Sequence, residues 1–269
     1  MKASICIEML YPGLLPEEKI RRIAGHGFRV VEFWGHKDKD IEALRRACSE
    51  TGVTIANFSG NRAGDLIDSS THDIVLSDIA ETVSVARLLG TDTLMVLSNE
   101  LGEGGKVMHA CLQFSEAAKR DNLVEGLKKL MATVPQDICI ALEPLNTVLD
   151  HPGNYLTGTK QTEAVIRQVG DPRLKILCDF YHMALMGEDP PETARRYAAS
   201  IGYVHIADYP GRHEPGTGNG PWVDTLRELR DHGYKGYIGF EFAPLGDSDA
   251  ALEAVVRLWR EALGMEAAL

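Results

Sequence analysis

Short apolar runs rich in β-branched residues alternate with longer amphipathic stretches along the whole chain. Short runs of this kind predict buried strands, and an apolar period of about 3.6 residues predicts the helices that cover them. The predicted strands lie near 3–9, 29–34, 53–58, 93–98, 138–143, 174–179, 203–207 and 237–242. The predicted helices lie near 16–25, 40–51, 71–90, 114–133, 160–169, 190–200, 221–233 and 248–263.

This strand-then-helix alternation predicts an α/β fold, a single (β/α)8 TIM barrel that takes up residues 1–269 as one domain. An open sheet of the Rossmann kind is the alternative, but no GxGxxG follows the first strand, where the chain reads LYPGLLPEE. Glycines stand where helices should end before the next strand, at Gly27, Gly52, Gly90, Gly170 and Gly233. Only the tail, 264–269, has no reason to be ordered, and we expect it to fray.

The predicted loops are unequal in length. Those from helix to strand are short, whereas several of those from strand to helix are long and rich in Gly and polar residues, such as NELGEGGKVMHACLQ and DYPGRHEPGTGNG. In a (β/α)8 barrel the strand-to-helix loops form the C-terminal face, where active sites are built. The sequence therefore predicts a covered pocket on that face.

Charge and composition narrow the classes of partner. The formal net charge is −11, and Lys and Arg do not cluster, which excludes a nucleic-acid partner. No apolar run is long enough for a membrane span, and the N-terminal run is broken by Glu8 and Pro12, so it predicts a strand rather than a leader. The 5 cysteines are odd in number and form no CxxC, which favours reduced thiols and a cytoplasmic location. We expect a small-molecule substrate, and assembly into a homo-oligomer stays open.

Four polar residues end four consecutive predicted strands: Glu143, Asp179, His205 and Glu241. Because side chains alternate along a strand, each of the four can point into the barrel mouth. Carboxylates that converge repel one another, and a divalent cation removes that repulsion. Oxygen ligands with one imidazole suit Mn2+, Mg2+ or Co2+. A helix cap or an Arg pair would explain any one of these residues, but not all four together.

Two further residues are candidates for contacting a substrate. His182 follows Asp179 by three positions on what is predicted to be the same loop. Arg212 lies on the loop PGRHEPGTG directly after the strand of His205, and its guanidinium could hold a carboxylate or a pair of hydroxyls. A salt bridge within the loop, to Glu214 or Asp208, is the alternative for this arginine.

These motifs resemble a known family. ALEPLN, HPGNYLTGT, DFYHM, HIAD, PGRHEPGTG and GFEF are similar to the hydroxypyruvate isomerase branch of the xylose-isomerase-like sugar isomerases and epimerases, and GFRVVEFW matches more loosely. The resemblance implies a TIM barrel with one divalent metal held by Glu143, Asp179, His205 and Glu241. It further implies that Glu143 and Glu241 act as the acid/base pair, while His182 and Arg212 contact substrate.

The reaction implied by the resemblance is the interconversion of hydroxypyruvate and tartronate semialdehyde through a cis-enediolate. Two departures bear on the substrate. Bacterial isomerases of this branch carry Gln where this chain has His205, which is the residue of the ketose 3-epimerases, and the loop GNRAGDLIDSS differs from the family's usual sequence. The alternative is therefore a ketose 3-epimerase, or an isomerase acting on a longer sugar or sugar acid of four to six carbons.

Other readings of the same scaffold are weaker. A cyclic polyol ketone dehydratase would use a similar site, and a non-catalytic sugar-binding module would not need all four ligands. An endonuclease IV type of enzyme needs several more His ligands, whereas the remaining histidines are scattered: His26, His36, His72, His109, His151 and His232. For Trp34 and Trp222 we expect packing in the core, with a position in the pocket wall as the alternative.

Overall fold

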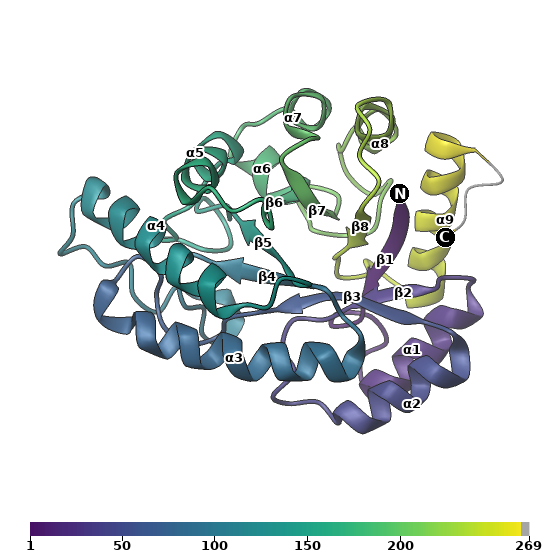
Figure 1. Ribbon diagram of the computed structural model, residues 1–269. Coiled ribbons are helices and arrows are strands. Elements are labelled where there is room, and N and C mark those ends of the chain that lie inside the picture. The colour runs from purple at the N-terminus through teal and green to yellow at the C-terminus, as the bar shows by residue number, and fades with distance from the viewer. Residues whose placement is uncertain (265–268) are drawn as a thin grey trace.

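The strands of the computed structural model, which describes residues 1–264 and 269, form a closed parallel barrel (Figure 1). Each strand pairs with its neighbour in chain order, and β1 pairs with β8, with Ser4 opposite Gly239. The predicted fold class is therefore confirmed. The strands are β1 (Lys2–Cys6), β2 (Val30–Glu32), β3 (Thr54–Ser59), β4 (Thr93–Leu97), β5 (Cys139–Glu143), β6 (Leu174–Asp179), β7 (Ile201–Ile206) and β8 (Tyr237–Phe240).

Helices surround this ring of strands (Figure 1). They are α1 (Pro16–Gly25), α2 (Ile41–Thr51), α3 (His72–Leu89), α4 (Glu116–Thr133), α5 (Thr159–Val169), α6 (Phe180–Leu185), α7 (Pro190–Tyr197), α8 (Trp222–Asp231) and α9 (Ser248–Leu263), with short 3-10 turns η1 (Ser69–Thr71) and η2 (Glu103–Gly105). The described helices include none that is long and apolar enough to cross a membrane. The predicted frayed tail falls mostly on residues 265–268, which lie outside the described part.

Helix ends follow the glycine pattern of the sequence. Gly52, Gly90 and Gly170 each end a helix in the left-handed conformation, with φ of 69°, 70° and 76°. Only glycine adopts this conformation at little cost, so each of these residues stops its helix and turns the chain toward the next strand. The result is short helix-to-strand loops, which leave the long loops on the opposite face of the barrel.

Most of the buried apolar residues in the described part of the chain form two separate clusters. Alternate strand residues such as Ile140 and Leu142 belong to the large cluster that includes the helices, whereas Ala141 belongs to a small cluster inside the barrel. The small cluster contains Val30, Ala56, Met95, Ala141, Leu177 and Tyr203. Because Glu143 follows Ala141 by two positions, its side chain points into the barrel, as the sequence predicts.

Helix α6 differs from the expected structure. The sequence predicts a loop after Asp179, but a helix of 6 residues begins there. The Asp179 carboxylate caps it, because Oδ1 accepts the N–H groups of Tyr181 and His182 at 2.8 and 3.2 Å. His182 is therefore fixed on a helix rather than carried by a loop.

Candidate active site

Three carboxylates from neighbouring strand ends converge on one buried atom, Nδ1 of His205. Glu241 Oε2 lies 3.5 Å from this nitrogen, Glu143 Oε1 lies 3.7 Å away and Asp179 Oδ2 lies 4.0 Å away. All four residues are buried. The parallel register explains the convergence, since Asp179 on β6 is directly opposite His205 on β7. The structure thus brings together the four residues that end strands in the sequence.

This cluster fits a divalent cation. His205 Nδ1 is buried and has no hydrogen-bond partner among the described residues, although three carboxylates surround it. Ligand atoms of Asp179, His205 and Glu241 lie within 4.8 Å of one another, as do those of Glu143, Asp179 and His182. Carboxylate oxygens with one imidazole form the donor set that Mg2+, Mn2+ and Co2+ accept. The donors present therefore suit a metal ion of this kind.

The pKa shifts of the four residues show that the cluster favours a positive charge in its midst. Burial raises the pKa of Asp179 to about 7 and also raises that of Glu143. Burial acts the same way on Glu241, but the charges of Arg212 and His205 outweigh it and lower the pKa of this carboxyl. For His205 burial opposes the charged form, yet Glu32 and Glu241 hold its pKa well above the usual value. Glu143 and Glu241 thus differ in proton affinity.

Glu32, at the end of β2, is a site residue that the sequence analysis missed. Its Oε1 lies 3.0 Å from His205 Nε2 as an ion pair, and its other oxygen accepts the hydroxyls of Ser4, at 3.0 Å, and Tyr203. Because Glu32 faces Nε2, it leaves Nδ1 as the nitrogen that meets the three carboxylates. Glu32 ends its strand in GFRVVEFW just as Glu143 ends β5, which is the signal that could have identified it.

The close packing of Glu32 against His205 depends on Gly239. A Cβ at this position of β8 would lie 2.6 Å from both carboxylate oxygens of Glu32 and 2.6 Å from Cδ2 of His205. Any larger residue would displace the imidazole. Gly239 therefore gives the two charged side chains room to meet beneath the mouth of the barrel.

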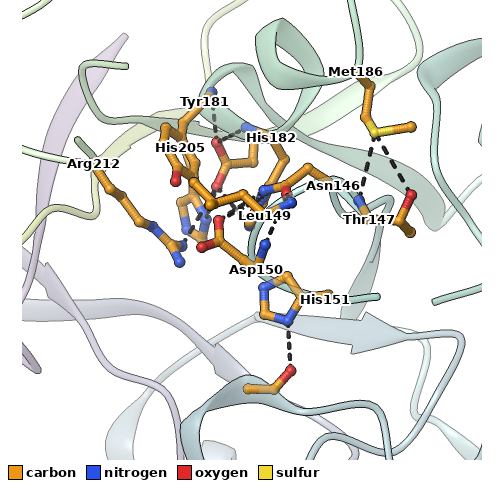
Figure 2. Close-up of polar contacts among 12 residues, drawn as sticks. Asn146, Thr147, Leu149, Asp150, His151, Tyr181, His182, Met186, His205 and Arg212 are labelled. Carbon is orange, nitrogen blue, oxygen red and sulfur yellow. Dashed lines mark hydrogen bonds and ion pairs between the residues drawn. The ribbon is translucent and has the colours of Figure 1, made fainter. Parts of the chain in front are cut away.

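His182 lies on α6, and Figure 2 shows it near His205 and Asn146. Its Nε2 is 3.5 Å from Asp179 Oδ2, and its Nδ1 is 2.6 Å from the side-chain nitrogen of Asn146. Burial and the nearby Arg212 charge hold the pKa of His182 well below its usual value. The ring is therefore a neutral hydrogen-bonding group next to the carboxylates.

Arg212 reaches the cluster from the loop between β7 and α8. Asp208 organises this loop by accepting the backbone N–H groups of Tyr209, Gly216, Gly218 and Gly220. The Arg212 guanidinium then lies over the ring of Tyr181 and donates to Glu241 Oε2 at 2.6 Å, with Asp179 Oδ2 at 3.9 Å. Its ion-pair partners in the described part are these site carboxylates, not Glu214 or Asp208.

A cavity of about 430 Å³ opens above these residues. Its lining includes Glu143, Glu241, His182 and Arg212, together with residues from other loops: Trp34, Arg62, Leu145, Asp150 and His151. The predicted pocket therefore exists. A space of this size falls within the usual range for small-molecule sites.

Two residues of the cavity correct expectations from the sequence. Trp34 takes the alternative position, in the pocket wall rather than the core: it is 36% exposed and its indole N–H donates to Glu241 Oε1. Trp222 is buried as expected. His151, which reads in the sequence as one of several scattered histidines, lies in the cavity wall next to His182, with 5.2 Å between ring centroids.

A parallel barrel with buried carboxylates and imidazoles at its C-terminal mouth is typical of barrel enzymes that act on small molecules. Residues 20–262 match the xylose isomerase-like TIM barrel family, and the chain belongs to this family. It is 29% identical over 242 residues to hydroxypyruvate isomerase of Escherichia coli K12, covering 87% of this chain and 90% of that protein.

A second relative is named for a different substrate. The chain is 26% identical over 255 residues to 2-oxo-tetronate isomerase of Cupriavidus necator, covering 91% of this chain and 94% of that protein. Among solved structures, an AP endonuclease of family 2 from Brucella melitensis superposes with a TM-score of 0.85 at 22% identity, covering 95% of this chain and 98% of that one, which shows the fold alone. The relatives place this chain among the sugar-type isomerases.

Proposed function

We propose that the protein interconverts hydroxypyruvate and tartronate semialdehyde with the help of one divalent ion, Mn2+, Mg2+ or Co2+. The observation that carries the proposal is the convergence of Glu143, Asp179 and Glu241 on the free Nδ1 of His205. These four residues would hold the ion. When bound, such an ion polarises the substrate carbonyl and acidifies the neighbouring C–H.

The two glutamates are the proposed acid/base pair. One carboxylate removes the proton from the carbon next to the carbonyl, giving a cis-enediolate, and a carboxylate returns a proton to the adjacent carbon. Their pKa values are shifted in opposite directions, upward for Glu143 and downward for Glu241. Different proton affinities at one site suit a reaction that both removes and returns a proton. His182 would stabilise the oxyanion through a hydrogen bond.

The cavity also offers positive charge for a substrate carboxylate. Arg212 faces the cavity beside Glu241, and Arg62 lines it from the loop after β3. No ion pair of the described residues involves the Arg62 side chain, which leaves its guanidinium available. A carboxylate binds guanidinium groups through charge-assisted hydrogen bonds. These two arginines favour an acid over a neutral sugar.

A second candidate is an isomerase or ketose 3-epimerase acting on a longer sugar or sugar acid of four to six carbons. The observation that favours it is the cavity volume of about 430 Å³, which exceeds what a three-carbon acid needs. The acid/base pair would serve both reactions, because they differ only in the carbon that receives the proton.

The test is a substrate panel in D2O. Metal-loaded protein is incubated with hydroxypyruvate, 2-oxo-tetronate and a set of pentuloses and hexuloses, and products and C–H exchange are followed by NMR. Tartronate semialdehyde that carries deuterium at its new C–H bond is the result expected. Exchange confined to C3 of a ketose would favour the epimerase instead, and no exchange with any compound would contradict both candidates.

The free thiols are the basis on which we propose a cellular location for the reaction. The structure contains five free cysteines, at Cys6, Cys48, Cys111, Cys139 and Cys178. Cys6, Cys111 and Cys178 are buried. Thiols that remain reduced fit the cytoplasm, where a small sugar or hydroxy-keto acid would be the partner.

A further inference from the structure

His151 has one ring nitrogen engaged and the other free. Its Nδ1 lies 2.7 Å from the backbone carbonyl oxygen of Gly105, on η2. A carbonyl only accepts hydrogen bonds, so Nδ1 carries the hydrogen and the neutral ring presents a lone pair at Nε2. His151 is 93% buried, since its exposed fraction is 7%, and burial lowers its pKa. The surroundings therefore favour the neutral tautomer with a hydrogen-bond acceptor at Nε2.

The backbone at Gly105 is shaped for this contact. A Cβ at Gly105 would lie 2.8 Å from Cε1 of His151, and its φ is +74°, a conformation that favours glycine. The imidazole can therefore pack directly on the loop that closes one side of the cavity. Figure 2 shows the ring of His151 between this loop contact and Asp150.

His182 is the opposite tautomer, with its hydrogen on Nε2. The Asn146 side-chain oxygen accepts the backbone N–H groups of Leu149 and Asp150 at 3.1 and 3.0 Å, so its amide nitrogen must face the other way. That nitrogen lies 2.6 Å from His182 Nδ1 and donates to Asp150 Oδ2 at 2.8 Å. Because an amide N–H donates, His182 Nδ1 accepts and the hydrogen of this ring is on Nε2.

The two rings therefore offer a donor and an acceptor to one cavity. Their centroids are 5.2 Å apart, and both residues line the cavity. The Nε2 atom of His151 has no hydrogen-bond or ion-pair partner within residues 1–264 and 269. A substrate with adjacent carbonyl and hydroxyl oxygens has the complementary pattern.

We propose that His151 is a further catalytic residue, the acceptor of the substrate hydroxyl proton, acting opposite the donor His182. The inference rests on the proposed isomerisation. In that reaction one glutamate takes the C3 proton of hydroxypyruvate, and a carboxylate returns a proton to C2. The O3–H bond must also break and an O2–H bond must form. His151 Nε2 takes the O3 proton as the aldehyde forms and returns it to O2, so the imidazole ends neutral while His182 donates a hydrogen bond to O2.

The decisive variant is His151→Asn. The amide nitrogen of Asn can replace Nδ1 as donor to the Gly105 carbonyl, so the loop contact persists while the acceptor at Nε2 is lost. Conversion to tartronate semialdehyde should fall by about 100-fold, a typical loss for an acid/base group. Deuterium exchange at C3 of hydroxypyruvate needs no oxygen-to-oxygen proton transfer, so it should stay within about threefold of wild type. His151→Ala should regain conversion when imidazole is added.

The control is His232→Asn, at the end of α8, where the side chain is 42% exposed and far from any assigned role. It should leave both rates unchanged. Equal losses of conversion and exchange in His151→Asn would overturn the proposal and assign His151 a structural role, as would no loss of either rate. If His151→Asn fails to fold, judged by circular dichroism, the conversion-to-exchange ratio of His151→Gln decides the question in the same way. Wild-type protein that neither converts nor exchanges hydroxypyruvate would instead contradict the proposed function.

Discussion

At the scale of single residues, the hydrogen-bond and ion-pair partners of each site side chain decide which of its atoms donate, accept or carry charge. Glu32 occupies one nitrogen of His205, and the other nitrogen faces the three carboxylates. Arg212 and Trp34 both donate to Glu241, which lowers the pKa of that carboxyl against the effect of burial. Glu143 and Glu241 therefore differ in proton affinity, and so can take different roles, although they are the same type of residue.

Replacing either glutamate by glutamine tests the acid/base pair. Glu143→Gln and Glu241→Gln each keep the shape of the side chain but remove the group that carries the proton, so turnover should fall by at least about 100-fold. Initial rates with saturating Mn2+ measure the effect. Glu125→Gln, on an exposed part of α4, serves as the control. Activity within tenfold of wild type in both site variants would contradict the assigned role.

Glu32→Gln tests the support of His205. The change removes the charge that faces Nε2, while Ser4 and Tyr203 keep an oxygen to donate to. Loss of such a partner typically weakens metal affinity by about 10- to 100-fold. Mn2+ binding measured by electron paramagnetic resonance should show this loss, with Glu42→Gln on the surface of α2 as the control. Equal affinities of Glu32→Gln and wild type would show that Glu32 does not orient the imidazole.

At the scale of elements, the apolar pattern predicts the strands and the long helices well, because each buries a regular face. Helix α6 was not predictable this way, since its 6 residues cover less than two turns and its cap, Asp179, also ends a strand. Other connections between elements depend on the contacts of a single long side chain. Arg173 donates to the carbonyls of Met131, Val134 and Pro135, so it ties the end of α4 to the start of β6.

Arg173→Ala should therefore destabilise the fold. The side chain is 12% exposed, and its loss removes the guanidinium donor from those carbonyls and from Asp171, which keeps only the backbone N–H of residue 173. Hydrogen bonds to a charged group suggest a loss of about 2–3 kcal/mol in the free energy of unfolding. Urea denaturation measures it, with Arg120→Ala as the exposed control. A similar small change in both variants would show that Arg173 contributes little to stability.

At the scale of the whole molecule, the barrel explains which site residues a sequence can reveal. Glu143, Asp179, His205 and Glu241 lie within one residue of a strand end, and the ends of parallel strands must meet at one face. Asn146 and His151 lie on a loop whose path no periodicity determines. Glu32 depends on a partner distant in the chain, since its contact with Tyr203 spans 171 residues. The roles of Asn146, His151 and Glu32 can therefore be recognised only in the folded barrel.

The central claim is that one divalent ion at the barrel mouth supports isomerisation. It is tested most directly by titrating Mn2+ into chelator-treated protein while the conversion of hydroxypyruvate is followed. Conversion should be absent at the start and should rise to a plateau at about one ion per chain, as expected for a single site formed by Glu143, Asp179, His205 and Glu241. Full conversion by the metal-free protein, or none at any Mn2+ concentration, would contradict the account.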